Sequence, residues 1–182
     1  MISLNSKIFV KKIVITGPES TGKSFLARSL SAFFNQAHTE EEARNFLNTL
    51  KRPYRYSDLY KIAIKQIASE DAFLPKEFSL LFCDTDLITI KIWSQVKYGK
   101  VDDRILEAIE RRFYDHYLLC YPDIPWEPDP LRENPHNRHE LFDLYRTELE
   151  FYGKKFTVIE GTEYEKRFLT AIAAVQKIVR IK

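Results

Sequence analysis

Residues 12–24 read KIVITGPESTGKS, and this stretch decides the fold. Its first part, residues 12–16, is a β-branched run with the length of a buried strand. Its second part, residues 17–24, matches G-x-x-x-x-G-K-[ST] at every fixed position. Glycines let such a loop wrap closely and turn its N–H groups toward phosphate oxygens. The stretch therefore predicts a phosphate-binding loop (P-loop, Walker A) between a strand and a helix.

The loop and the first turn of the next helix are the candidate nucleotide contacts. Lys23 can bridge the β- and γ-phosphates, which makes it a candidate catalytic residue, and the Ser24 hydroxyl can ligate Mg²⁺. The partial positive charge of the helix N-terminus adds to the attraction for phosphate. The residues assigned to the nucleotide are Gly17, Pro18, Glu19, Ser20, Thr21, Gly22, Lys23, Ser24 and Phe25.

The rest of the chain alternates short apolar runs with longer amphipathic segments. Further strands are expected at residues 37–39, 79–83, 117–121 and 156–160. Helices are expected from residue 23 onward, over 41–50, from a Ser57 cap to 73, and over 87–98, 101–113, 138–151 and 164–181. Phe113 and Val179 are predicted to face inward from their helices. Apolar strands that alternate with helices are typical of a parallel sheet covered on both faces. We therefore expect one three-layer α/β domain over residues 1–182, with a mostly parallel sheet.

Composition narrows the class of protein. The chain has 182 residues, of which 45% are hydrophobic and 30% charged, an ordinary globular balance. Lys and Arg exceed Asp and Glu by 28 − 26 = 2, which gives no electrostatic reason to expect nucleic-acid or membrane-surface binding. Cys83 and Cys120 lie in apolar runs, as buried thiols do, and no Cys/His cluster suggests zinc. No apolar run or leader pattern indicates a membrane span or a signal peptide, so a cytoplasmic protein is expected.

A second group of candidate residues follows the strand expected at 79–83. Asp84 and Asp86 flank Thr85 at the carboxyl end of this strand, where a parallel α/β fold has its ligand crevice. Asp84 is a candidate Mg²⁺ ligand, and either aspartate is a candidate general base toward an attacking hydroxyl. The alternative is that one or both cap the following helix.

A proline-rich segment at 122–138 interrupts the pattern of helices and strands. It holds five of the eight prolines, which exclude a regular helix or central strand. It also contains Arg132 and Arg138, and phosphoryl-transfer enzymes commonly bring a guanidinium onto the transferring phosphate from a closing segment. The segment is predicted to be a lid carrying two catalytic arginines, or otherwise a solvated surface loop.

Three further side chains are candidates for the acceptor side of the site. Glu41 and Arg44 are three residues apart at a helix start, so that both face the crevice or form a surface ion pair. Gln66 lies on an otherwise apolar helix face, and its amide needs a partner in the substrate or the backbone. The four histidines show no metal-ligand spacing.

Together these motifs resemble the ribosylnicotinamide kinase domain of NadR-type proteins of NAD metabolism. The resemblance runs from about residue 12 to residue 179. It rests on GPESTGKS, Glu41-Glu42-Ala43-Arg44, Gln66, Phe82-Cys83-Asp84-Thr85-Asp86, Trp126 with Arg132, and Tyr164 with Arg167.

The resemblance implies a P-loop kinase that transfers the γ-phosphate of ATP to the 5′-hydroxyl of nicotinamide riboside. It implies that Asp84 and Asp86 share metal and general-base duties, with Arg132 and Arg138 in the lid and Arg167 near the adenine. The residues it assigns to the acceptor are Glu41, Arg44, Gln66, Asp86 and Trp126.

The sequence also departs from the family pattern. Glu42 stands where an aromatic residue is expected between the acid and Ala43-Arg44. A helix-turn-helix and an adenylyltransferase domain, which the fullest members carry, are not expected in 182 residues. The alternatives are a kinase for another nucleoside and a nucleotide-dependent regulatory ATPase.

Overall fold

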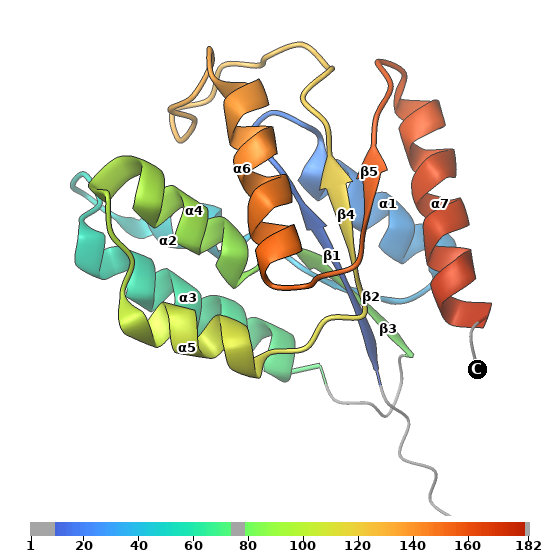
Figure 1. Ribbon diagram of the computed structural model, residues 1–182, viewed down its shortest axis with the longest axis horizontal. Coiled ribbons are helices and arrows are strands. Elements are labelled where there is room, and N and C mark those ends of the chain that lie inside the picture. The colour runs from blue at the N-terminus through green and yellow to red at the C-terminus, as the bar shows by residue number, and fades with distance from the viewer. Residues whose placement is uncertain (1–9, 74–78, 181–182) are drawn as a thin grey trace, which may run out of the picture.

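A parallel sheet forms the middle layer of the structure, a computed structural model that describes residues 10–73 and 79–180 (Figure 1). Its strands are β1 (Lys11–Thr16), β2 (Ala37–Thr39), β3 (Leu80–Asp84), β4 (His116–Cys120) and β5 (Phe156–Ile159). The order is β2-β3-β1-β4-β5, and every neighbouring pair is parallel. The carboxyl ends of all these strands therefore meet at one edge, and the predicted parallel α/β fold is confirmed.

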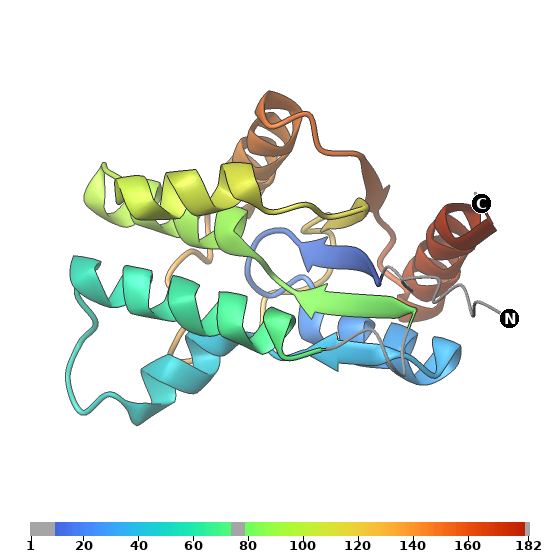
Figure 2. The same cartoon turned by 90° about the horizontal axis from the view of Figure 1, so that it is seen from below.

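Helices cover both faces of this sheet (Figure 2). The helices α1 (Lys23–Phe34) and α7 (Tyr164–Arg180) pack on one face. The other face is covered by α3 (Tyr56–Asp71), α4 (Leu87–Tyr98), α5 (Asp103–Arg111) and α6 (Arg138–Phe151), with α2 (Glu42–Thr49) beside α3. Each face has its own apolar core, which gives the expected three layers. In the described part of the chain, no helix combines the length and apolar character of a membrane span.

Two inward-facing predictions are wrong. Phe113 is 76% exposed, because α5 ends at Arg111 and Arg112 has extended backbone. That turn lets the Arg112 guanidinium reach Glu70 and Asp71, both at 2.8 Å. Val179 is 40% exposed, and its neighbour Ile178 packs against the core instead.

The start of α3 differs from the prediction in its capping residue. Ser57 is inside the helix, and the backbone N–H of Arg55 is bound at 2.9 Å by the carboxylate of Asp58. Asp58 is fully buried and also accepts two hydrogen bonds from Arg52, at 2.7 and 3.0 Å, and one from Lys61 at 3.1 Å. A carboxylate that reaches back to the N-cap satisfies a free helix donor, so the entry to α3 depends on Asp58.

Asp58→Asn is expected to lower the free energy of unfolding by about 2 kcal/mol near neutral pH, because charge-assisted hydrogen bonds are lost. Arg52, the Arg55 N–H and Lys61 hold the pKa of Asp58 well below its usual range. A carboxyl whose pKa is lowered by folding stabilises the fold fully above its unfolded value of about 3.9, and this contribution declines steadily as the pH falls from there toward the lower pKa of the folded state. Urea unfolding from pH 7 to pH 3 should therefore show the wild type and the variant converging. A constant difference would contradict this role for the charge.

Candidate active site

The P-loop leaves β1 and turns back toward the sheet before α1 begins. Gly17 has φ +128°, and a Cβ there would lie 2.6 Å from the carbonyl oxygen of Cys120 in β4. Gly22 has φ +76° at the N-cap of α1, and Ser20 also has a positive φ. Lys23 Nζ donates to the carbonyl oxygen of Pro18 at 2.7 Å. The loop has the conformation that aims backbone N–H groups into an anion site.

Asp84, at the end of β3, is a buried carboxylate without a protein partner. It is 1% exposed, and neither oxygen makes a hydrogen bond to the residues that the structure describes. Burial raises its pKa to about 7; Glu41 adds to the rise, whereas the nearby Ser24 hydroxyl and Lys23 ammonium oppose it. A buried acceptor in this state needs a cation or a proton donor, because an unmade hydrogen bond is costly.

These residues fit a magnesium ion held together with phosphates. Ser24 offers a hydroxyl and Asp84 a free carboxylate, both hard oxygen ligands beside the P-loop. Within residues 10–73 and 79–180, no three His, Cys, Asp or Glu side chains are grouped closely enough to hold a metal by themselves. Mg²⁺ usually keeps several waters and takes further ligands from substrate phosphates. The donor set is therefore suited to a metal that arrives with a nucleotide.

Asp86 lies in a different environment from Asp84. Its Oδ1 accepts from the backbone N–H groups of Ile88 and Thr89, at 3.2 and 3.4 Å, so it caps α4. Its Oδ2 accepts from the Tyr117 hydroxyl at 2.8 Å. The side chain is 1% exposed and absent from the lining of the main cavity, and burial raises its pKa to about 7. These hydrogen bonds are those expected from the capping alternative.

Gln66 supports the turn between the two aspartates. Thr85 occupies this turn with φ +69°, an unfavourable conformation for a residue other than glycine. Gln66 Nε2 lies 3.4 Å from the Thr85 carbonyl oxygen and 3.4 Å from Glu70, and Gln66 is 2% exposed. The structure thus gives the Gln66 amide backbone and side-chain partners beneath the site and leaves it out of the cavity lining.

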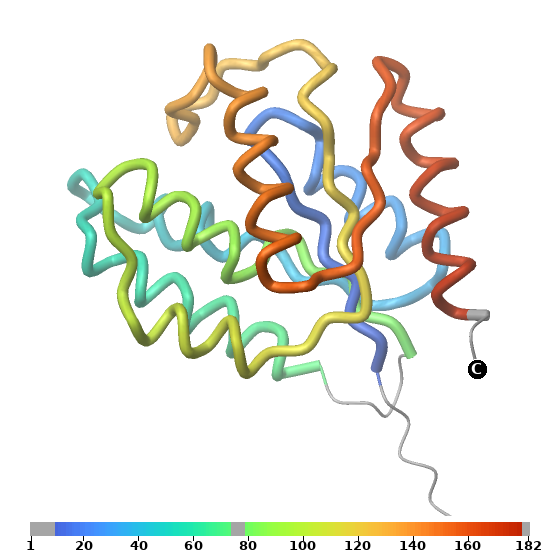
Figure 3. The backbone as a smooth tube through the Cα atoms, in the orientation of Figure 1, coloured from blue at the N-terminus to red at the C-terminus, as the bar shows by residue number. Residues whose placement is uncertain are grey.

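The proline-rich segment crosses the carboxyl ends of the strands between β4 and α6 (Figure 3). The Ser20 hydroxyl accepts from the backbone N–H of Glu127 at 2.9 Å and from Arg132 at 3.3 Å. Arg138 donates to the carbonyl oxygens of Ser20 and Ile124, at 3.1 and 3.0 Å. The sequence-predicted arginines are therefore both brought to the P-loop.

The same segment makes further contacts on both sides. Glu19 of the P-loop accepts from the backbone N–H groups of Glu133 and Asn134. Arg44 of α2 donates to Asp129 at 2.8 Å, and its Nε lies 3.7 Å from Glu41. Through these contacts the proline-rich segment is attached to both the P-loop and α2.

A cavity of about 530 Å³ lies under this segment and extends from the P-loop to α2 and α4. Of the predicted site residues, the cavity lining includes the whole of Gly17–Phe25, Glu41, Arg44 and Arg132. It does not include Asp84, Asp86, Gln66, Trp126, Arg138 or Arg167. Trp126 instead lies beside the guanidinium groups of Arg132 and Arg138, at 5.9 and 5.7 Å from its ring.

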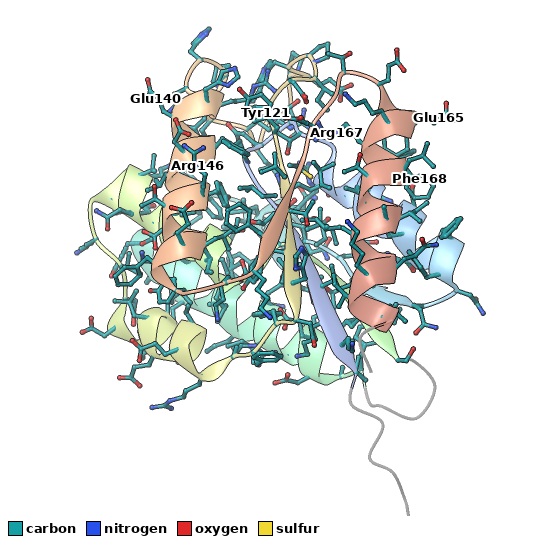
Figure 4. The ribbon with its side chains drawn as sticks, turned by 45° about the vertical axis from the view of Figure 1, so that its right-hand side comes forward. Tyr121, Glu140, Arg146, Glu165, Arg167 and Phe168 are labelled. Carbon is teal, nitrogen blue, oxygen red and sulfur yellow. The ribbon has the colours of Figure 1, made fainter. Side chains whose placement is uncertain are left out.

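Arg167 is a buried side chain at the end of the sheet that carries the P-loop. Figure 4 shows Arg167 and Tyr121 at the same upper end of the molecule. Its Nη2 donates to the Thr21 carbonyl oxygen at 3.0 Å, and its Nη1 to Asp123 at 2.5 Å and to Tyr121 and Gly161 carbonyls at 3.3 Å. Arg167 is 3% exposed, and its guanidinium contacts the backbone of the P-loop from outside the cavity lining.

The cavity lining also includes residues that the sequence did not assign to the site. Tyr164 packs its ring 4.2 Å from that of Phe25 near the P-loop, and Trp93 and Glu133 also line the cavity. Tyr164 was visible in the sequence as part of the family motif. Trp93 gave no local signal, because an aromatic residue at helical spacing reads as core.

Known proteins are similar to this chain in sequence and in fold. A family model described as "AAA domain" (AAA_28) matches residues 12–167. The chain belongs to this AAA-domain family. Two curated relatives of the AAA-domain chain are the trifunctional NAD biosynthesis/regulator proteins NadR of Escherichia coli K12 and Salmonella typhimurium LT2. They are 28% and 26% identical to it over 177 residues. The resemblance to NadR is thereby confirmed, and the alignment covers 94% of this chain but 43% of each relative.

Solved structures agree on the fold. A NadR protein in complex with NR superposes with a TM-score of 0.78 at 23% identity, covering 96% of the AAA-domain chain and 53% of that protein. A thymidylate kinase from Ehrlichia chaffeensis superposes with a TM-score of 0.65 at 13% identity, covering 93% and 99% of the two chains. The sheet and its helices are therefore those of P-loop kinases.

Proposed function

We propose that the AAA-domain chain is an ATP-dependent nucleoside kinase whose acceptor is nicotinamide riboside. The observation that carries this proposal is the cavity, which extends from the P-loop to α2 and α4 beneath the proline-rich segment with Arg132. A kinase must hold two substrates in line and exclude water, and a cavity with a phosphate end and an organic end under a lid suits that task. The NR in the related NadR structure supports the choice of acceptor, and the thymidylate kinase neighbour supports a kinase of this fold.

At the phosphate end, the backbone of the P-loop and Lys23 would hold the β- and γ-phosphates. Ser24 and Asp84 would hold Mg²⁺, which neutralises phosphate charge when bound. Arg132 reaches the cavity from the lid, defined here as residues 122–138, and would stabilise charge on the transferring phosphoryl group. Arg138 would instead fasten the lid through Ser20 and Ile124.

At the acceptor end, Glu41 is the carboxylate best placed to act as general base. It lines the cavity at the start of α2, it is partly exposed, and its charge acts on Asp84. In this step the 5′-hydroxyl proton passes to Glu41 while the hydroxyl oxygen attacks the γ-phosphorus. The bond from that phosphorus to the β–γ bridging oxygen breaks, and ADP leaves. Asp86 would act as the cap that holds α4, and Gln66 as the support of the Thr85 turn.

The test is release of ADP from Mg-ATP in the presence of nicotinamide riboside, of each common ribo- and deoxyribonucleoside, or of no acceptor. Release that needs nicotinamide riboside, with nicotinamide mononucleotide identified by mass, is the expected result. Release with another nucleoside would show that the chain is a kinase whose acceptor is not nicotinamide riboside. Release without any acceptor would favour the regulatory ATPase.

Glu41→Gln is expected to lower kcat by about 10²–10⁴-fold, the range for loss of a general base. The KM for ATP should stay within about two-fold of the wild type, because in the proposed mechanism Glu41 contacts the acceptor hydroxyl and the P-loop holds the phosphates. The matched control is Glu42→Gln, which makes the same change one residue later, outside the cavity lining. Equal effects of the two substitutions on kcat would rule out Glu41 as the base.

A further inference from the structure

Helix α4 forms one wall of the cavity. Thr89 lines the cavity near the sheet, with its hydroxyl 3.1 Å from that of Thr16 in β1. Trp93 and Val96 also line it, and they lie four and seven residues further along the same helix. Such spacing puts the three side chains on one helix face, with Trp93 about 6 Å beyond Thr89 along the axis. Leu47 of α2 and Leu131 of the lid line the same cavity.

Trp93 is held in one orientation by its neighbours. Its indole N–H donates to the Tyr54 hydroxyl at 2.7 Å, and the two rings meet edge to face at 4.7 Å. The Tyr54 hydroxyl donates in turn to Glu133 of the lid at 2.8 Å. Lys97 pairs with the same carboxylate at 2.6 Å and lies 3.9 Å from the Tyr54 ring. Tyr54 therefore connects a side chain of the cavity wall to the lid.

The indole N–H is satisfied by the Tyr54 hydroxyl, and Trp93 is part of the cavity lining. A flat heteroaromatic ring stacks favourably on an indole ring. A ring with a positive charge gains a cation–π attraction as well, and tryptophan gives the strongest of these.

We propose that the base of the acceptor nucleoside stacks on Trp93. This contact favours nucleosides with a planar and preferably cationic ring. Tyr54 is a positioning residue that links Trp93 to the lid through Glu133. The proposal rests on the proposed function and adds the residues that determine its specificity. In this proposal Trp93 provides an aromatic contact in a chain that has Glu42 where an aromatic residue was expected.

The first test uses fluorescence, which reports contact without turnover. The chain has two tryptophans, so Trp126→Phe leaves Trp93 as the sole indole emitter and Trp93→Phe leaves Trp126. Nicotinamide riboside is titrated into the wild type and both variants, since a stacked pyridinium quenches indole emission. The expected result is saturable quenching by at least about half in the wild type and Trp126→Phe, and little in Trp93→Phe. Quenching that persists in Trp93→Phe, or a wild type that turns over nicotinamide riboside without quenching, would overturn the proposal.

The second test separates positioning from general stability. Tyr54→Phe removes the shared hydroxyl and keeps the ring, and is expected to raise the KM for the acceptor by about five-fold, as for the loss of one hydrogen bond, with the KM for ATP unchanged. Tyr56→Phe is the matched control, because Tyr56 is outside the cavity lining. An unchanged acceptor KM in Tyr54→Phe would overturn the link. Absence of phosphorylation of any nucleoside by the wild type would instead reject the proposed function.

Discussion

Lys23→Ala is expected to reduce phosphoryl transfer by about 10³-fold or more, because a preorganised charge on the transferring phosphate is lost. Lys23 Nζ makes a hydrogen bond to the Pro18 carbonyl oxygen and lies in the cavity lining. Its removal should therefore shift Tm by no more than about 2 °C, as for one partly exposed hydrogen bond. The coupled ADP-release assay and a thermal melt measure the two effects.

The control for this substitution is Lys65→Ala, which removes an exposed lysine of α3 outside the cavity lining. It should retain the wild-type rate. If Lys23→Ala kept more than about a tenth of the wild-type rate, the loop would not be the site where the phosphate is transferred.

Gly17→Ala is expected to lower the free energy of unfolding by about 2–6 kcal/mol. The new Cβ would lie 2.6 Å from the backbone oxygen of Cys120, and neither strand can move without disturbing the sheet. The strained φ of +128° costs about 1–3 kcal/mol and the forced contact about 1–3 kcal/mol more. Chemical denaturation at neutral pH measures the change.

Gly153→Ala separates the contact from the backbone conformation. Gly153 also has a positive φ, of +61°, but a Cβ there would meet nothing within 4 Å. Its cost should be about 1 kcal/mol, the penalty of the left-handed conformation. Equal losses in the two variants would show that the approach of Gly17 to β4 does not matter for stability.

Local patterns were sufficient for the fold. The motif of residues 17–24 requires a strand before it and a helix after it, and the apolar runs that follow have the length of buried strands. A parallel sheet brings all the carboxyl ends together, so the meeting of the P-loop, Asp84 and the proline-rich segment was predictable. The end of α5 was not, because Arg112 leaves the helix to bind Glu70 and Asp71 on α3.

The candidate site also has features that the sequence predicts and features that depend on tertiary contacts. The sequence by itself predicted Lys23 and Ser24 as the residues for phosphate chemistry, because both belong to the motif of one loop. Only the tertiary structure shows the hydrogen-bond partners of Asp86, Gln66 and Arg167, each of which bonds to a residue distant in the chain. It also brought together Tyr54, Trp93 and Glu133, which come from a loop, a helix and the proline-rich segment. A side chain's type can be read in isolation, but whether its polar atoms are satisfied depends on which distant segments the fold packs against it.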